Sequence, residues 1–390
     1  MAQQSSADPS KLTWVGADNG AASTTSARRE LYLKLFSGEL FKGFQRNTIA
    51  RDLITKRTLK NGKSLQFIFT GRTGSEFHTP GNNILGNTDG TPPVAQVNIE
   101  CDDLLISSAF VYELDETLAH YDLRGEISRK IGYALAENYD RRIFRAVAKA
   151  ARMASPITKS SFVEPGGTQI RVGTNDKASD AYVPASIVNA FYDAAAALDE
   201  KGVSGEGRVA VLSPRQYYEL IQDTSTNALI NRDETGDALQ SGNGIIEIAG
   251  IKIYKSMNIP MFGKFGVKYG GGDTATSPNL TDPGNSGSFV SDSMGDQEPS
   301  TTPSGQKTVN DYGEEAKFDH SCGLIFQKEA VGCVEAIGPQ VQVTSGDVSV
   351  IYQGDVILGR LAMGAKPLNP AAAVELIAGA AVGAGNNAAF

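Results

Sequence analysis

The chain has 390 residues, of which 41% are hydrophobic, and its formal net charge is −8. This length suits two or three domains or one elongated subunit, and the acidic balance disfavours a basic nucleic-acid-binding domain. It does not exclude a shell around nucleic acid. Cys101, Cys322 and Cys333 are odd in number and widely spaced, which favours a reducing compartment. No signal peptide is predicted, because the N-terminus lacks a basic region followed by an apolar core. No membrane span is predicted either, because the longest apolar run, Ala371–Gly385, is mostly alanine and glycine.

Residues 1–58 are predicted to form an N-terminal arm. Its first 27 residues are rich in Ser, Thr, Ala, Gln and Gly, which is typical of a flexible segment. The next stretch predicts a short amphipathic helix, broken near Ser37-Gly38. The apolar residues of this helix are Leu31, Leu35, Leu40 and Phe44.

Residues 59–114 are predicted to form a protruding hairpin and a return strand. Leu65, Phe67 and Phe69 alternate with other side chains, and Val94–Glu100 alternates again, as strands do. The stretch between these runs is rich in glycine and proline, and it contains Arg72 and Phe77. The hairpin has few bulky apolar residues, so we expect it to lack a core of its own and to need a neighbour.

Residues 115–183 are organised around a long helix, predicted over Tyr121–Met153. Thirty-three residues make a rod of about 50 Å. Because four-residue spacing drifts around the axis, such a helix would bury different faces along its length. Gly125 and Gly132 lie within it, among strong helix formers. The apolar residues that set the spacing are Leu123, Ile127, Ile131, Leu135, Ile143 and Val147.

The last turns of this helix carry a basic cluster, with two interpretations left open. Cations are favoured near a helix C-terminus, and Glu137 can pair with Arg141 four residues on. Alternatively, the cluster makes an inter-subunit ion-pair patch or a weak contact with packaged nucleic acid. The cluster contains Arg141, Arg142, Arg145, Lys149 and Arg152.

Residues 184–322 are predicted to form a compact α/β lobe, because helix and strand patterns alternate there. A helix begins at Pro184, a buried strand covers Arg208–Leu212, and a hairpin turns at Ala249-Gly250. Residues 266–311 are dominated by Gly, Ser, Thr, Asp, Asn and Pro, and are expected to be an exposed insertion. Strands return over 323–370, and residues 371–390 are predicted to be a low-complexity tail.

No catalytic, metal or cofactor site is predicted. Gly62-Lys63-Ser64 resembles the end of a phosphate-binding loop, but Arg57 stands where that motif needs glycine. The three histidines, His78, His120 and His320, lack the spacing of a local zinc site. The chain is therefore expected not to be an enzyme.

The order of these parts resembles the HK-97-type major capsid fold of tailed bacteriophages, an α+β fold. The N-arm, E-loop, P-domain with spine helix and A-domain of that fold correspond to residues 1–58, 59–114, 115–183 and 184–322. Several stretches are similar to capsid proteins of short-tailed phages that carry their own RNA polymerase. They include RRELYLKLFSGELFKGFQRNT, NGKSLQFIFTGRTGSEFHTPGNN, HYDLRGEISRKIGYALAENYD, EIAGIKIYKSMNIP and GRLAMGAKPLNPAAAV.

The resemblance implies a structural function without a cofactor or a membrane. Copies would assemble as hexamers and pentamers into an icosahedral shell around double-stranded DNA, in the virion, after assembly in the bacterial cytoplasm. The implied partners are a scaffolding protein, a portal complex and a decoration protein or fibre. The spine would bend or straighten when a procapsid expands, with Gly125 and Gly132 as its flex points. The implied inter-subunit contacts are Leu31, Leu35, Leu40, Phe44, Phe67, Phe69, Arg72, Phe77, Arg141, Arg142 and Arg145.

Two alternatives remain at this point. An encapsulin-type nanocompartment shares the fold but encloses cargo enzymes, and genome-length DNA in purified particles would distinguish the phage shell from it. A cytosolic α/β enzyme would need a pocket with converging titratable groups, which the sequence does not offer. The 266–311 insertion looks longer than the usual connection in the family, and the alanine- and glycine-rich tail matches no known segment.

Overall fold

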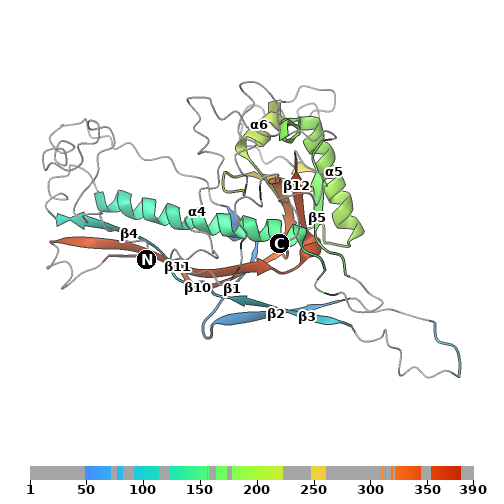
Figure 1. Cartoon of the computed structure of the whole chain (residues 1–390), viewed down its shortest axis with the longest axis horizontal. Helices are drawn as coiled ribbons and strands as arrows, with labels where there is room; N and C mark the ends of the chain where they lie inside the picture. Colours follow the sequence, from blue (N-terminus) through green and yellow to red (C-terminus); the bar gives the residue numbers. More distant parts are fainter. Residues whose placement is uncertain are drawn as a thin grey trace.

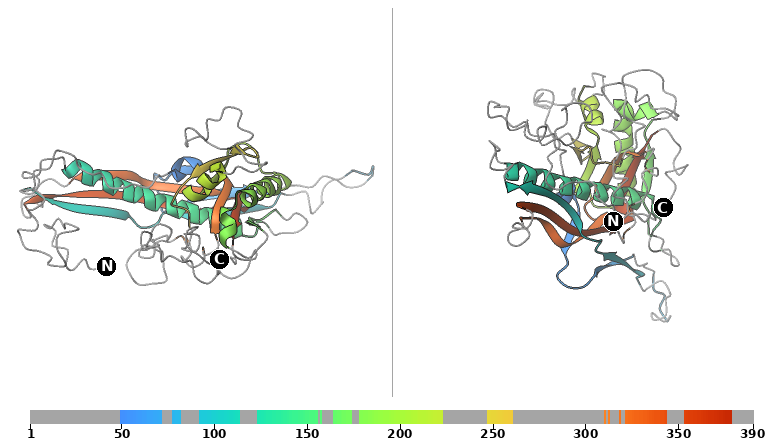
Figure 2. Two further views of the ribbon diagram at one scale, coloured as in Figure 1. Left: turned by 90° about the horizontal axis from the view of Figure 1, so that it is seen from above. Right: turned by 60° about the vertical axis from the view of Figure 1, so that its left-hand side comes forward.

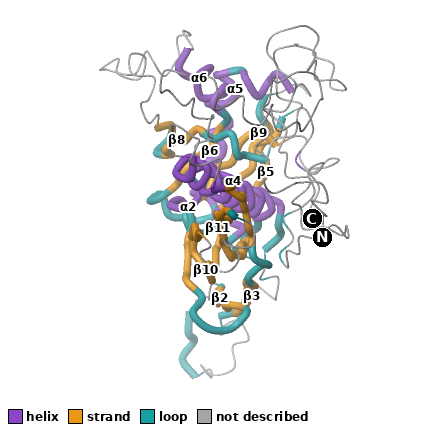
Figure 3. Tube along the Cα trace, turned by 90° about the vertical axis from the view of Figure 1, so that its left-hand side faces the viewer, coloured by secondary structure: helices purple, strands orange, loops and turns teal. Residues whose placement is uncertain are grey.

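The computed structural model describes residues 49–71, 77–81, 92–113, 123–155, 157, 164–173, 178–222, 247–260, 310, 312, 318, 321–343 and 353–378. One long helix lies along a four-stranded sheet, and an α/β lobe stands at the C-terminal end of that helix (Figure 1). Viewed along the helix, the lobe and a two-stranded hairpin lie on opposite sides of it (Figure 3). No helix in the described part of the chain is long and apolar enough to cross a membrane.

The long helix, α4, covers Leu123–Arg152 and confirms the predicted spine. Its first half buries a stripe that includes Ile131 and Leu135, whereas residues 138–148 are buried on every side. The change from one buried face to complete burial agrees with the drifting four-residue spacing. The helix is therefore a surface rod at one end and a core helix at the other.

The four-stranded sheet beneath α4 has the order β1-β10-β11-β4. Its strands are β1 (Thr55–Thr58), β10 (Val331–Val343), β11 (Gly354–Pro367) and β4 (Leu105–Tyr112). Only β1 and β10 run parallel. The view from above shows α4 following the long strands (Figure 2). A side chain on Gly359 would place a Cβ 2.4 Å from Cγ2 of Ile131, so glycine lets the helix lie close to the sheet.

The hairpin consists of β2 (Ser64–Thr70) and β3 (Val94–Glu100), paired antiparallel. Its base packs on the chain's own β10, where Phe67, Ile99 and Val334 form a small buried cluster. At the base, the neighbour that the hairpin was expected to need is therefore the chain's own β10 and not another subunit. The partner, Val334, comes from a strand more than 200 residues away, which local sequence could not indicate.

The lobe contains a six-stranded sheet with the order β5-β12-β9-β6-β8-β7. Helices α5 (Pro184–Glu200) and α6 (Pro214–Gln222) accompany it, together with the short 3-10 helix η1 (Ala178–Tyr182). Pro184 stands in the first turn of α5, as predicted. The strands are β5 (Thr168–Arg171), β12 (Ala373–Ile377), β9 (Ser321–Gln327), β6 (Arg208–Leu212), β8 (Ile251–Lys255) and β7 (Glu247–Ile248).

The predicted tail at residues 371–390 is wrong for its first part. The 3-10 helix η6 (Pro370–Ala372) and strand β12 are buried, and β12 lies between β5 and β9 inside the lobe sheet. Small apolar residues looked like low complexity because nothing local reveals that two strands flank them. Residues 379–390 lie outside the described part of the chain.

Several predictions fall outside the described residues and stay predictions. They concern the arm helix with Leu31, Leu35, Leu40 and Phe44, the hairpin residue Arg72, and most of the 266–311 insertion. The predicted end of that insertion is wrong, since Asn310 is 1% exposed and bonded into the core. The exposed stretch therefore cannot extend to residue 311.

Candidate assembly elements

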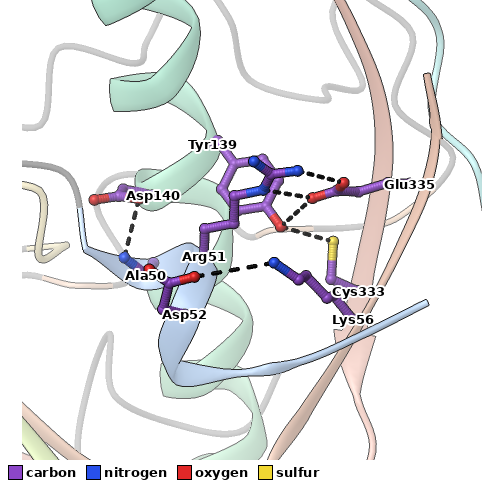
Figure 4. A network of polar contacts seen from close by, with 8 residues as sticks. All are labelled: Ala50, Arg51, Asp52, Lys56, Tyr139, Asp140, Cys333 and Glu335. Atoms are coloured by element: carbon purple, nitrogen blue, oxygen red, sulfur yellow. Dashed lines mark hydrogen bonds and ion pairs between the residues drawn. The ribbon is translucent and has the colours of Figure 1, made fainter. Parts of the chain in front are cut away.

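The root of the N-terminal arm is attached to the spine by one carboxylate. Asp140 accepts hydrogen bonds from the backbone N–H groups of Ile49, at 2.7 Å, and Ala50, at 3.2 Å. These groups open the short helix α2 (Ala50–Leu53), which has no side-chain cap of its own. Asp140 therefore caps α2 from another helix, as Figure 4 shows for Ala50. It also accepts a bond from Nδ2 of Asn258, which follows β8, at 3.3 Å.

Burial raises the pKa of Asp140 to about 6. The hydrogen bonds from Ile49, Asn258 and Ala50 favour the ionised form and lower the pKa in part, while nearby Glu137 raises it. At neutral pH the Asp140 carboxylate is ionised, and its burial in the charged form lowers the free energy of unfolding. The folded state binds more protons than the unfolded state between the ordinary carboxyl pKa and about 6.

Asp140→Asn should therefore remove the loss of stability that the Asp140 carboxyl causes as pH rises from 4 to 7. As pH rises from 4 to 7, the wild-type chain should lose up to about 3 kcal/mol relative to the variant, because a shift of one pKa unit is worth about 1.4 kcal/mol. Urea unfolding at a series of pH values measures this difference. Asp52→Asn, which removes an exposed carboxylate of α2, is the matched control and should run parallel to the wild type. A constant difference between Asp140→Asn and wild type would contradict the assignment.

A second network holds the same root to β10 (Figure 4). The guanidinium of Arg51 donates to both carboxylate oxygens of Glu335, at 3.0 and 3.2 Å, and the Tyr139 hydroxyl donates to Glu335 at 2.9 Å. Burial by itself raises the pKa of Glu335, but the bonds from Arg51 and Tyr139 outweigh it and the pKa is lowered. Tyr139 also lies 3.3 Å from Sγ of Cys333. The arm root is thus fixed to α4 and to β10 at once.

The three predicted contact arginines of the spine are buried within their own chain. Arg141 pairs with Glu137 at 2.6 Å, which confirms the i,i+4 interpretation. Arg142 lies 3.7 Å from Asp102, and the Arg145 guanidinium lies 5.3 Å from the ring centre of Phe318. The expectation of an inter-subunit patch or a nucleic-acid contact is corrected, because none of these side chains reaches the subunit surface.

Sequence reasoning missed the hub at Asp102, a buried carboxylate with several hydrogen-bond partners. The Asp102 carboxylate accepts bonds from the backbone N–H of Asn310 at 3.1 Å, from its amide Nδ2 at 2.9 Å, and from the Tyr312 hydroxyl at 2.6 Å. Because its partners lie 208 and 210 residues further on, no local signal could have revealed them. The hub fixes this later segment beside the spine.

The two predicted flex points, Gly125 and Gly132, lie within α4. The helix continues through both glycines. A Cβ added at Gly132 would meet nothing within 4 Å, so packing does not require glycine there. Glycine weakens a helix by roughly 1 kcal/mol relative to alanine, which agrees with a flex point. Bending at Gly125 and Gly132 stays a prediction.

The outer part of the hairpin presents apolar side chains to solvent. Ile68 and Val94 are 74% and 62% exposed, and Phe77 is fully exposed. Phe67, by contrast, is buried against β10 and Phe69 is half-buried, so Phe67 is not available to a neighbour. Exposed apolar groups gathered on one projecting element mark an interaction surface. Among the described residues, no three His, Cys, Asp or Glu side chains lie close enough to hold a metal ion.

Comparison with known proteins identifies the family. Residues 66–295, more than half of the chain, match the family described as Gp10A-like major capsid protein. The chain belongs to this family. The major capsid protein of Enterobacteria phage T3 is 23% identical over 368 residues, covering 93% of this chain and 96% of the relative. That of Escherichia phage T7 is 28% identical over 202 residues, or 51% of this chain and 58% of the relative.

Solved phage capsids share the fold. The capsid of cyanophage P-SCSP1u matches with a TM-score of 0.68 and 28% identity, over 94% of this chain and 99% of that chain. The mature capsid of bacteriophage PhiM1 matches with a TM-score of 0.58 at 15% identity, which supports the fold alone. The predicted HK-97-like α+β fold is confirmed, and the protein is a podovirus-type major capsid protein, a structural protein. The comparisons give no support to the nanocompartment alternative.

Proposed function

We propose that copies of this Gp10A-like capsid protein assemble as hexamers and pentamers into an icosahedral shell around the double-stranded DNA of a podovirus-like phage. The observation that carries the proposal is the projecting hairpin, on which the apolar side chains of Ile68, Phe77 and Val94 are largely exposed. Covering a side chain such as Phe77 is worth about 1.5–3 kcal/mol. A neighbouring subunit supplies that cover in a closed shell.

The further partners in the proposal are a scaffolding protein during assembly, a portal complex at one vertex and a decoration protein or fibre. DNA would be enclosed without sequence-specific contacts. Burial of Arg141, Arg142 and Arg145 supports this, since the most basic stretch of the spine is withheld from solvent. The N-arm, E-loop, P-domain and A-domain boundaries, and an outward-facing 266–311 insertion, belong to the same proposal.

The hairpin can be tested without disturbing its base. The backbone N–H of Gly71 donates to the Pro93 carbonyl at 2.8 Å, directly beyond the pair Thr70–Val94. Replacing residues 72–92 with Asn-Gly should therefore close a short hairpin and leave the Phe67 cluster intact. We expect a soluble chain with an unchanged unfolding transition that forms no closed shells with its scaffolding protein, as seen by electron microscopy.

Two matched variants complete the test. Phe77→Ser removes one exposed ring, and Lys60→Ser changes an exposed residue of the turn before β2. Shell yield should fall with Phe77→Ser and remain at the wild-type level with Lys60→Ser. Normal particles from the shortened hairpin would overturn the proposed role of the hairpin in assembly.

A further inference from the structure

A hollow of about 300 Å³ lies beside the arm root, between α2, the spine and the long strands. One wall is formed by Leu135, Ala136 and Tyr139 of α4, and Pro339 and Leu361 come from β10 and β11. The arm contributes its own root, with Ile49, Arg51 and Asp52 along the remaining side. The hollow is therefore an open, partly apolar site that the root of the arm borders.

The first described residues of the arm are held in place at this site. Ile49 and Ala50 are held by Asp140, and Arg51 is held by Glu335. Residues 1–48 precede this anchored point. Phe44 is five residues before Ile49, so it can reach no further than about 17 Å from the anchor. The hollow starts at the anchor itself, well within that reach.

We propose that the hollow is the docking site of residues 40–44 of the same chain, with Phe44 as the side chain that fills it. Leu40 and Phe44 are four residues apart, so they share one face of a helical turn that can meet the Leu135 and Ala136 wall. A tether of five residues gives a high effective concentration of Phe44 at this site. The same segment from a second copy has no such tether, so the arm of the same chain is favoured.

Disulfide trapping tests the docking in the full-length soluble subunit before any assembly. The background is Cys101→Ser, because Cys101 is partly exposed while Cys322 and Cys333 are buried. Phe44→Cys with Ala136→Cys should form an intrachain disulfide under mild oxidation, read as a mobility shift on a non-reducing gel. The matched control is Phe44→Cys with Ala134→Cys, an exposed alanine two positions earlier on the same helix. Two positions rotate the side chain by about 200°, away from the hollow.

The trapping experiment distinguishes docking of the arm of the same chain from docking of the arm of a second copy. Mixing two differently tagged chains distinguishes a disulfide within one chain, which supports the proposal, from one between chains, which would overturn it. Trapping no stronger than that of the Ala134 control would overturn it as well. Because the readout comes from soluble subunits, failure here leaves the role of the hairpin in shell assembly untouched, and failure of assembly leaves this result untouched.

A thermal measurement gives an independent check. Phe44→Ala should lower the unfolding midpoint by roughly 2–4 °C if the ring is buried in the hollow. In an Ala136→Phe background, where a new ring fills the hollow from the spine, the same change should produce no shift. An equal shift in both backgrounds would show that Phe44 packs elsewhere.

Discussion

Arg152→Met is expected to cost the subunit about 3–5 kcal/mol of unfolding free energy, a large share of the stability of an ordinary domain. The Arg152 guanidinium donates two hydrogen bonds to the Glu375 carboxylate, at 2.7 and 2.6 Å, and the two side chains are 1% and 0% exposed. Methionine would leave the buried Glu375 carboxylate with a neutral partner, the side-chain amide of Gln169, which donates to it at 3.0 Å. The midpoint and slope of urea unfolding measure the loss.

The paired variant distinguishes loss of a partner from loss of packing. Arg152→Met with Glu375→Leu removes both charges and fills similar volume, so it should recover most of the lost stability. Lys130→Met changes an exposed cation of the same helix and should stay within about 0.5 kcal/mol of the wild type. If Arg152→Met were as stable as the wild type, the pair would not hold the end of the spine against β12.

Local signals in the sequence were sufficient for elements whose ends are set by nearby chemistry. Pro184 opens α5. The strand β6, Arg208–Leu212, is buried along its whole length, as its apolar sequence predicts. Gly62 has a φ of 93°, which glycine adopts without strain in the turn before β2. The Ser213 hydroxyl accepts a hydrogen bond from the backbone N–H of Gln216 at 3.3 Å and caps α6. Each of these is decided within a few residues.

Partners far apart in the chain could not be predicted. Arg152 looked like one more cation near a helix end, and its carboxylate partner lies 223 residues away in a stretch that resembled a tail. Periodicity indicates which face of an element is buried, but it does not say what covers that face. The buried arginines of α4 and the strand β12 were therefore misjudged for one reason.

The candidate assembly residues illustrate the same limit. Phe67 and Phe77 both lie in the hairpin region and were given the same role from sequence. Val334 and the partly buried Leu368 cover the Phe67 cluster, whereas Phe77 is fully exposed. Only the long-range packing of the C-terminal strands on the hairpin base distinguishes them. The same packing distinguishes the anchored base of the hairpin from the exposed side chains of Ile68, Phe77 and Val94.

Gly364→Ala is expected to destabilise the subunit by roughly 3 kcal/mol and to lower shell yield. A Cβ at this position of β11 would lie 1.9 Å from the Glu100 carbonyl oxygen and 2.9 Å from Nδ2 of Asn310. The obstacle is backbone, and it is held in place: Asn310 donates to that carbonyl at 2.8 Å and to Asp102 at 2.9 Å. Relief therefore requires the end of β3 to move, and the hairpin moves with it.

The matched control is Gly338→Ala in β10, a strand of the same sheet, where an added Cβ would meet nothing within 4 Å. It should leave the free energy of unfolding within about 0.5 kcal/mol of the wild type and leave shell yield unchanged. Equal effects of the two substitutions would mean that loss of glycine flexibility, and not the clash at Glu100, is responsible. Gly364→Ala chains that still fold at low temperature should assemble poorly, because Glu100 ends β3 and so sets the direction in which the hairpin leaves the sheet.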